Sequence, residues 1–275
     1  MEATEGLSPQ STESFQDGYI SVIDRSPENP KTETPVFISP GWSENDEVLK
    51  DVVKELLNSG RRVITLSYSG VRDSDKKTDH PSVEVGKAEA ILEVIRLKGL
   101  KNADVVGHSE GAIGAIIAAS LEPDKIRNLI LVGPAGLIGK DTFPKLLGRF
   151  SMKVMKDHYR LLKDGESRKP MARFLQQGAK FAIRHPVQGI REAIAISQVQ
   201  LEDVLRDIHS QGVGTGIVSG VDDPVFKMSR LQQVVKADMV DAFVSVKGGH
   251  DEFHLQPRYA RATEQLLTSL ENRNR

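Results

Sequence analysis

Short runs of β-branched and apolar residues alternate along most of the chain with segments whose apolar residues recur at helical spacing. Several runs are apolar at nearly every position, which is typical of parallel strands covered on both faces. We expect strands at 19–23, 35–39, 62–67, 103–106, 128–132, 216–219 and 242–246, and helices at 47–58, 83–97, 112–121 and 257–270. This alternation predicts an α/β fold with a mostly parallel, doubly wound sheet.

The alternation stops between residues 139 and 211, where helical patterns replace strands. We expect helices at 150–162, 171–183 and 187–208. Pro170 and Pro186 fall where the first turns of two of these helices would begin. The pattern therefore predicts a core of residues 15–138 and 212–275, interrupted by a helical lid or cap at 139–211. A cap placed there would lie over the strand ends, where open α/β sheets bind ligands.

Composition narrows the classes of partner. The 275 residues include 37 Lys and Arg against 38 Asp and Glu, so the net charge is −1, and there is no cysteine. Such a charge gives no reason to expect nucleic acid or an anionic membrane as a partner. Residues 1–14 are polar, lack the features of a secretory signal and are expected to form a disordered tail. No apolar run is long enough to span a bilayer, so we expect a cytoplasmic protein.

The run GHSEG at 107–111 stands between an expected strand and an expected helix. This is the G-x-S-x-G pattern in the strand–turn–helix setting that it requires. A sharp turn there places Ser109 at the end of the strand, and the flanking glycines leave room for close passes of the chain. Ser109 is therefore the candidate nucleophile, near the positive end of a helix.

The chain resembles the α/β-hydrolase superfamily over nearly its whole length after the tail. Members carry nucleophile, acid and histidine in that order along the chain. Here GVDDPVF at 220–226 and GGH at 248–250 follow two expected strands. The resemblance assigns the triad acid to Asp223, with Asp222 as the alternative, and the triad histidine to His250. The carboxylate would orient the imidazole, which would act as base for Ser109.

The resemblance also locates an oxyanion hole. One donor is the backbone N–H of Glu110, after the nucleophile, and the other is that of Trp42, in the loop SPGWS at 39–43. Many members have His-Gly here, whereas this chain has Pro40 before the glycine; a backbone donor survives that change. The segment 67–74 resembles the family's D-x-x-G-x-G-x-S only in part and supports the fold alone.

These residues predict a serine hydrolase, similar to esterases and lipases, that cleaves an acyl bond in a small-molecule substrate through an acyl-enzyme. A carboxylic ester is the commonest substrate, while thioester, lactone, amide and C–C cleavage stay open, as does the oligomeric state. The alternative is a ligand-binding or signalling protein on the same fold, with little or no catalysis. We expect no cofactor. We also expect no metal, because His250 and His254 are four residues apart without the glutamate of the zincin motif at its place or an evident third ligand.

Overall fold

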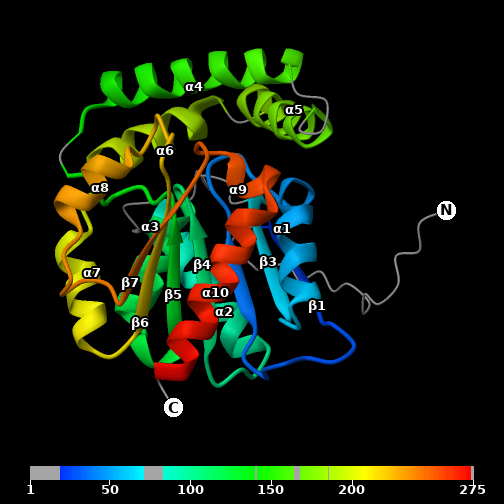
Figure 1. Cartoon of the computed structure of the whole chain (residues 1–275), viewed down its shortest axis with the longest axis vertical. Helices are drawn as coiled ribbons and strands as arrows, with labels where there is room; N and C mark the ends of the chain where they lie inside the picture. Colours follow the sequence, from blue (N-terminus) through cyan, green and yellow to red (C-terminus); the bar gives the residue numbers. More distant parts are fainter. Residues whose placement is uncertain (1–18, 71–82, 140, 164–167, 185, 274–275) are drawn as a thin grey trace.

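The computed structural model describes residues 19–70, 83–139, 141–163, 168–184 and 186–273, and its centre is one seven-stranded sheet (Figure 1). The strands are β1 (Tyr19–Arg25), β2 (Val36–Ser39), β3 (Val63–Gly70), β4 (Ala103–His108), β5 (Ile126–Val132), β6 (Gly214–Gly220) and β7 (Ala242–Val246). Their order across the sheet is β1-β3-β2-β4-β5-β6-β7. Only β1 runs antiparallel to its neighbour, so the predicted mostly parallel sheet is confirmed.

Helices cover both faces of this sheet. One face carries α1 (Asp46–Asn58), α9 (Glu252–Leu255) and α10 (Pro257–Arg273), and the other carries α2 (Val83–Leu97), α3 (Gly111–Leu121) and α7 (Glu202–Ser210). A short 3-10 helix (Pro123–Lys125) precedes β5, and α8 (Met228–Val234) follows β6. Three more helices, α4 (Phe143–Lys163), α5 (Arg168–Arg184) and α6 (Pro186–Gln198), pack on one another across one end of the sheet (Figure 1).

The core has two apolar layers, one on each face of the sheet. Along β4 and β5, Val105 and Leu129 pack with α2 and α3, whereas Val106 and Ile130 pack with α1 and α10. Every residue of β2, β4 and β6 is buried. This two-sided burial explains why the central strands are apolar at successive positions.

The helical segment differs from expectation in two places. The single helix expected at 187–208 is wrong: α6 and α7 are separate helices, and between them the Leu201 N–H donates to the Gly136 carbonyl. The helix expected at 150–162 begins two turns earlier, at Phe143. The short helices α8 and α9 had not been predicted. The expected tail at 1–14 lies outside the described residues. No helix in the described ranges is both long and apolar enough to cross a lipid bilayer.

The start of α3 packs tightly against the loop after β2, and Gly111 makes this contact possible. A Cβ at Gly111 would lie 2.3 Å from the carbonyl oxygens of both Ser39 and Pro40. We expect Gly111→Ala to lower the free energy of unfolding by about 3 kcal/mol, because backbone atoms must shift to admit the methyl group. Urea unfolding measures this change. Gly86→Ala in α2 is the control, since a Cβ there meets nothing within 4 Å; an equal loss in both variants would contradict the packing argument.

Candidate active site

Ser109 occupies the sharp turn between β4 and α3, with a backbone φ of 54°. That angle lies in the left-handed region, which residues with a Cβ rarely adopt. The turn is held by three backbone hydrogen bonds: the Ser109 N–H donates to Val132, and its carbonyl accepts from Ala112 and Ala135. A Cβ at Gly107 would lie 2.7 Å from the Cα of Ala112. The strained turn expected from the GHSEG run is therefore present, with glycine where the backbone passes closely.

His250 and Asp223 lie in line with this serine. The Ser109 hydroxyl donates to His250 Nε2 at 2.9 Å, and His250 Nδ1 donates to Asp223 Oδ2 at 2.7 Å. The three residues are 4%, 6% and 5% exposed, so little water competes for these bonds. Along the sequence, His250 is 27 positions from Asp223 and 141 positions from Ser109. The fold brings the three residues together.

The second oxygen of Asp223 is also satisfied. Oδ1 accepts the backbone N–H groups of Val225 at 2.7 Å and Phe226 at 3.0 Å. Asp222, the alternative acid, is exposed instead. Of the two neighbouring aspartates, Asp223 is the one that contacts the imidazole.

Gly133, after β5, leaves room for this pair. Its φ is 49°, and a Cβ there would lie 3.3 Å from His250 Nδ1 and 3.4 Å from Asp223 Oδ2. Any larger residue would press on the atoms that carry the hydrogen bond. Sequence reasoning gave this glycine no role in the site, because no catalytic motif marks it.

The charges and hydrogen bonds around His250 suit a general base. Burial alone would lower the pKa of His250, but the charge and the hydrogen bond of Asp223 outweigh it and raise the pKa above its ordinary value. Because Asp223 accepts from Nδ1, the neutral imidazole presents its lone pair at Nε2, toward the Ser109 hydroxyl.

The loop after β2 lies directly against Ser109. A Cβ on Gly41 would come within 3.0 Å of the Ser109 Cβ. The Glu44 N–H donates to the Gly41 carbonyl, and Ser43 has a φ of 64°, as the third residue of a type II turn does. Trp42 is the second residue of this turn. Its backbone N–H therefore comes directly after Gly41, the residue that lies against Ser109. Glu110 directly precedes the first residue of α3. Backbone N–H groups at this end of a helix have no acceptor within the helix, and this holds for the N–H of Glu110.

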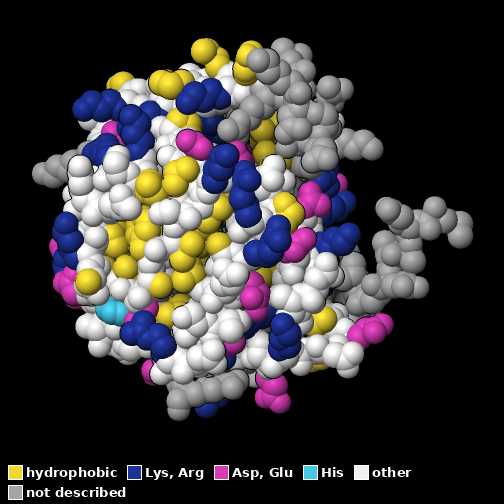
Figure 2. All heavy atoms as spheres, in the orientation of Figure 1, with side chains coloured by type: hydrophobic (Ala, Val, Ile, Leu, Met, Phe, Trp, Pro, Cys, Tyr) yellow, Lys and Arg dark blue, Asp and Glu magenta, His cyan; other side chains and the backbone are white. Residues whose placement is uncertain are grey.

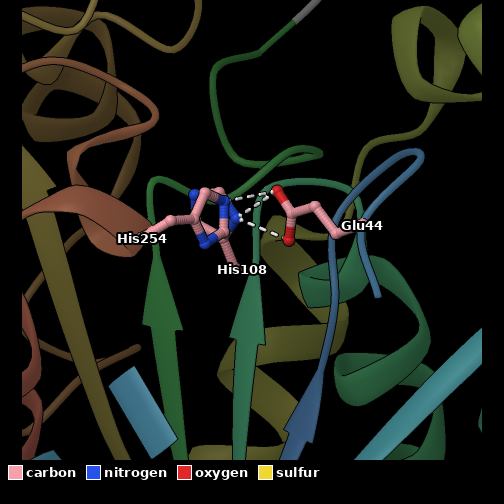
Figure 3. Close-up of side chains that lie close together, drawn as sticks. All are labelled: Glu44, His108 and His254. Atoms are coloured by element: carbon pink, nitrogen blue, oxygen red, sulfur yellow. Dashed lines mark hydrogen bonds and ion pairs between the residues drawn. The ribbon is translucent and has the colours of Figure 1, made fainter. Parts of the chain in front are cut away.

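A buried carboxylate, Glu44, holds this loop to two other segments (Figure 3). Its Oε2 accepts the Gly41 N–H at 2.6 Å, while Oε1 accepts from His108 Nδ1 at 2.8 Å and His254 Nε2 at 2.9 Å. His108 ends β4 and His254 lies on α9. The loop after β2, the turn that carries Ser109 and the segment after His250 thus share one hydrogen-bond acceptor.

The charge state of this cluster follows from its contacts. Burial would raise the pKa of Glu44, but His108 and His254 outweigh it and hold the pKa well below its ordinary value. Burial lowers the pKa of His108, despite the opposing effect of Glu44. Glu44 is therefore the anion, and the N–H groups around it are its solvation shell.

Glu44, His108 and His254 are also the residues whose types suit a metal ion, with ligand atoms within 4.8 Å of one another. Their nitrogen–oxygen separations of 2.8 and 2.9 Å are hydrogen-bond lengths. Two ligands of one tetrahedral zinc stand about 3.3 Å apart, given metal–ligand bonds of about 2.0 Å. The donor set fits hydrogen bonding better than coordination. His250 and His254, despite their spacing, contact different groups.

A second buried cluster lies behind Glu110. Its carboxylate contacts the Lys87 ammonium, which also lies 3.7 Å from Glu84 and 3.4 Å from Glu192 on α6. Burial would lower the pKa of Lys87, but the three glutamates raise it well above its ordinary value. Burial, together with Glu84, raises the pKa of Glu110 well above its ordinary value. This cluster connects a helix over the sheet end to the turn that carries Ser109.

Aromatic side chains from α4 and α5 meet the loop after β2. The half-buried Trp42 ring has edge contacts with Phe150 at 5.6 Å and Phe181 at 6.2 Å between centroids. Phe150 also lies 6.4 Å from the His250 ring, and Phe174 stacks on His254. Aromatic rings therefore border the loop beside Ser109 on this side. In the segment that resembles D-x-x-G-x-G-x-S, residues 71–74 lie outside the described residues.

Comparison with known proteins agrees with this architecture. No curated protein matches the chain. Solved structures that resemble it include an esterase from Exiguobacterium antarcticum, with 21% identity, a TM-score of 0.70 and coverage of 94% of this chain and 98% of that chain. Another is a membrane phospholipase A described as a bacterial virulence factor, with 17% identity, a TM-score of 0.71 and coverage of 97% and 87%. At such identities the likeness shows the fold.

A thermophilic esterase from Thermogutta terrifontis is similar at 16% identity, with a TM-score of 0.66 and coverage of 96% of this chain and 99% of that chain. A family model described as alpha/beta hydrolase fold matches residues 34–257, a range that includes the turn at Ser109, both aspartates and His250. With that match over most of its length, the chain belongs to the alpha/beta hydrolase fold family.

Proposed function

We propose that the protein is a serine hydrolase that cleaves an acyl bond, most simply a carboxylic ester, through an acyl-enzyme. One observation carries the proposal: Ser109, His250 and Asp223 form a continuous, buried hydrogen-bond chain at 2.9 and 2.7 Å. A serine hydroxyl is a weak nucleophile until a base takes its proton, and this chain supplies the base and its orienting carboxylate.

In the proposed reaction, Ser109 Oγ attacks the carbonyl carbon while His250 Nε2 takes the hydroxyl proton. The amides of Trp42 and Glu110 stabilise the oxyanion, each donor being worth about 3 kcal/mol in related sites. His250 then protonates the leaving group, and the acyl group stays on Ser109. A water molecule, deprotonated by His250, attacks the ester and releases the acid.

The substrate is proposed to be a small molecule with an apolar acyl group. The aromatic contacts of Trp42 with Phe150 and Phe181 support this choice. Several solved relatives are named esterases, and one is named a meta-cleavage product hydrolase, so C–C cleavage stays the next candidate. A panel of p-nitrophenyl esters of increasing acyl length measures ester cleavage and the preferred acyl group, and failure with every ester would favour C–C cleavage.

The helices α4–α6 are proposed to form the cap over this site. This is shorter than the cap of 139–211 expected from the sequence, because Leu205 and Ile208 of α7 are buried in the core layer that contains α3. The Lys87–Glu192 and Lys153–Asp251 ion pairs, both buried, link α6 and α4 to the rest of the molecule. They support a cap that is docked in its present position.

A fluorophosphonate probe tests the nucleophile directly. We expect covalent labelling of the wild type at Ser109, and we expect Ser109→Ala to remain folded while losing labelling and at least about 10³-fold of its esterase activity. Mass spectrometry locates the label, and circular dichroism checks the fold. A folded wild type that is not labelled would favour the alternative of a binding protein on the same fold.

Substitutions of Asp223 and Asp222 form a matched pair that tests which residue is the triad acid. Activity of the wild type should fall as pH drops through a His250 pKa above its ordinary 6.5, because the protonated imidazole cannot accept the serine proton. Asp223→Asn should lower kcat by about 10⁴-fold and move the acidic limb to lower pH, since the raising effect of Asp223 is lost. The exposed Asp222→Asn should change neither. The reverse result in a pH–rate profile would reassign the acid.

Glu44→Gln tests whether the buried carboxylate positions the loop after β2. An amide has one acceptor oxygen and turns its NH₂ toward a donor, so we expect a loss of about 2–3 kcal/mol in the free energy of unfolding, together with a lower kcat. The exposed Glu47→Gln on α1 is the control. Unchanged stability and kcat in Glu44→Gln would remove the positioning role. The same losses in the wild type after dialysis against a chelator would replace it with a metal site.

A further inference from the structure

The outermost helix of the cap carries apolar side chains on its outer face. In α4, Leu146 and Lys153 point inward and are buried, whereas Met152, Met155 and Tyr159 are 50%, 71% and 58% exposed. Spacings of three and seven residues put these three on one helix face. In α5 and α6, Ile183 and Ile190 are 81% and 57% exposed. An exposed apolar face of this extent marks an interaction surface.

The same segment is strongly basic, although the whole chain is nearly neutral. Residues 139–198 contain 13 of the 37 Lys and Arg but 5 of the 38 Asp and Glu, a net charge of +8. The remainder of the chain therefore carries −9 within the total of −1. Charge is segregated between the cap and the sheet domain.

Exposed cations border the apolar face. Lys145 and Lys156 lie seven residues before and four residues after Met152, on the adjoining strip of α4, and both are exposed. On α5, Lys180 and Arg184 lie on either side of Ile183 and are exposed as well. Figure 2 shows hydrophobic and basic side chains together along the top of the molecule, the position of α4 in Figure 1.

We propose that the outer face of α4 docks on an anionic lipid surface. Helices that lie in a membrane interface combine an apolar face, which enters the acyl boundary, with lysines that meet anionic headgroups. Met152, Met155 and Tyr159 supply the first element, and Lys145 and Lys156 supply the second. A second copy of the chain is a poorer occupant, because two caps of charge +8 would repel each other. Nucleic acid would leave the exposed methionines without a role.

The occupant is tested by flotation of the full chain with vesicles. We expect binding to vesicles of phosphatidylglycerol and phosphatidylcholine in equal parts, weaker binding at high salt, and little binding to phosphatidylcholine alone. Lys145→Gln/Lys156→Gln should weaken binding by roughly 30-fold. Met155→Ser/Tyr159→Ser should weaken it by about tenfold or more.

Matched controls lie away from the cap. The pair Lys31→Gln/Lys101→Gln removes two exposed charges, and Leu97→Ser/Leu121→Ser removes two exposed apolar groups at the far ends of α2 and α3. Both control pairs should bind vesicles like the wild type, and these pairs and Met155→Ser/Tyr159→Ser should hydrolyse a water-soluble ester at the wild-type rate.

Three outcomes would overturn the proposal: no binding to the mixed vesicles, equal losses in cap and control variants, or a wild-type dimer that Met155→Ser/Tyr159→Ser converts to monomer in sedimentation velocity. Vesicle binding is also measured with Ser109→Ala, so this result is independent of whether the protein is a hydrolase.

Discussion

The hydrogen bond between His250 and Asp223 is the contact on which the proposed chemistry depends. It fixes the tautomer of the imidazole, so that Nε2 is free to accept a proton from Ser109. The two residues follow β7 and β6, which are neighbours in the sheet, and Ser109 follows β4, two strands from β6. A parallel sheet places the carboxyl ends of these strands at one edge, and this topology brings together residues that are distant in the sequence.

Glu44 likewise fixes the loop beside Ser109 through hydrogen bonds to other elements. Proline stands at position 40, so the loop has no imidazole there, and the Glu44 carboxylate accepts the Gly41 N–H. The carboxylate also accepts from His108 and His254, so the loop cannot shift without breaking bonds to β4 and α9. A buried anion with three N–H donors is held in a narrow set of positions, and the donors of the proposed oxyanion hole are held with it.

The sheet could be predicted from the sequence because each strand carries a local pattern. The meeting of Ser109, Asp223 and His250 could be predicted because each of them sits in a local motif at a strand end. The contacts of Glu44 and Lys87 could not be predicted, since they join residues on separate elements that individually read as solvated charges. The break between α6 and α7 was missed for a different reason. Ile194, Leu201 and Leu205 continue an apolar helical spacing across it, while the backbone bond from Leu201 to Gly136 interrupts the helix.

Net charge alone does not decide whether the chain meets an anionic surface. A total of −1 gave no reason to expect an anionic surface as a partner, yet a sum over the chain says nothing about where the charges lie. Exposed charges act over about 8 Å at physiological ionic strength, so a surface meets only the charges near its point of contact. The acidic sheet domain is screened from anything that touches α4, so the proposed interaction would depend on the basic cap alone. The docking argument therefore depends on the charge of residues 139–198 and on the exposed methionines among them.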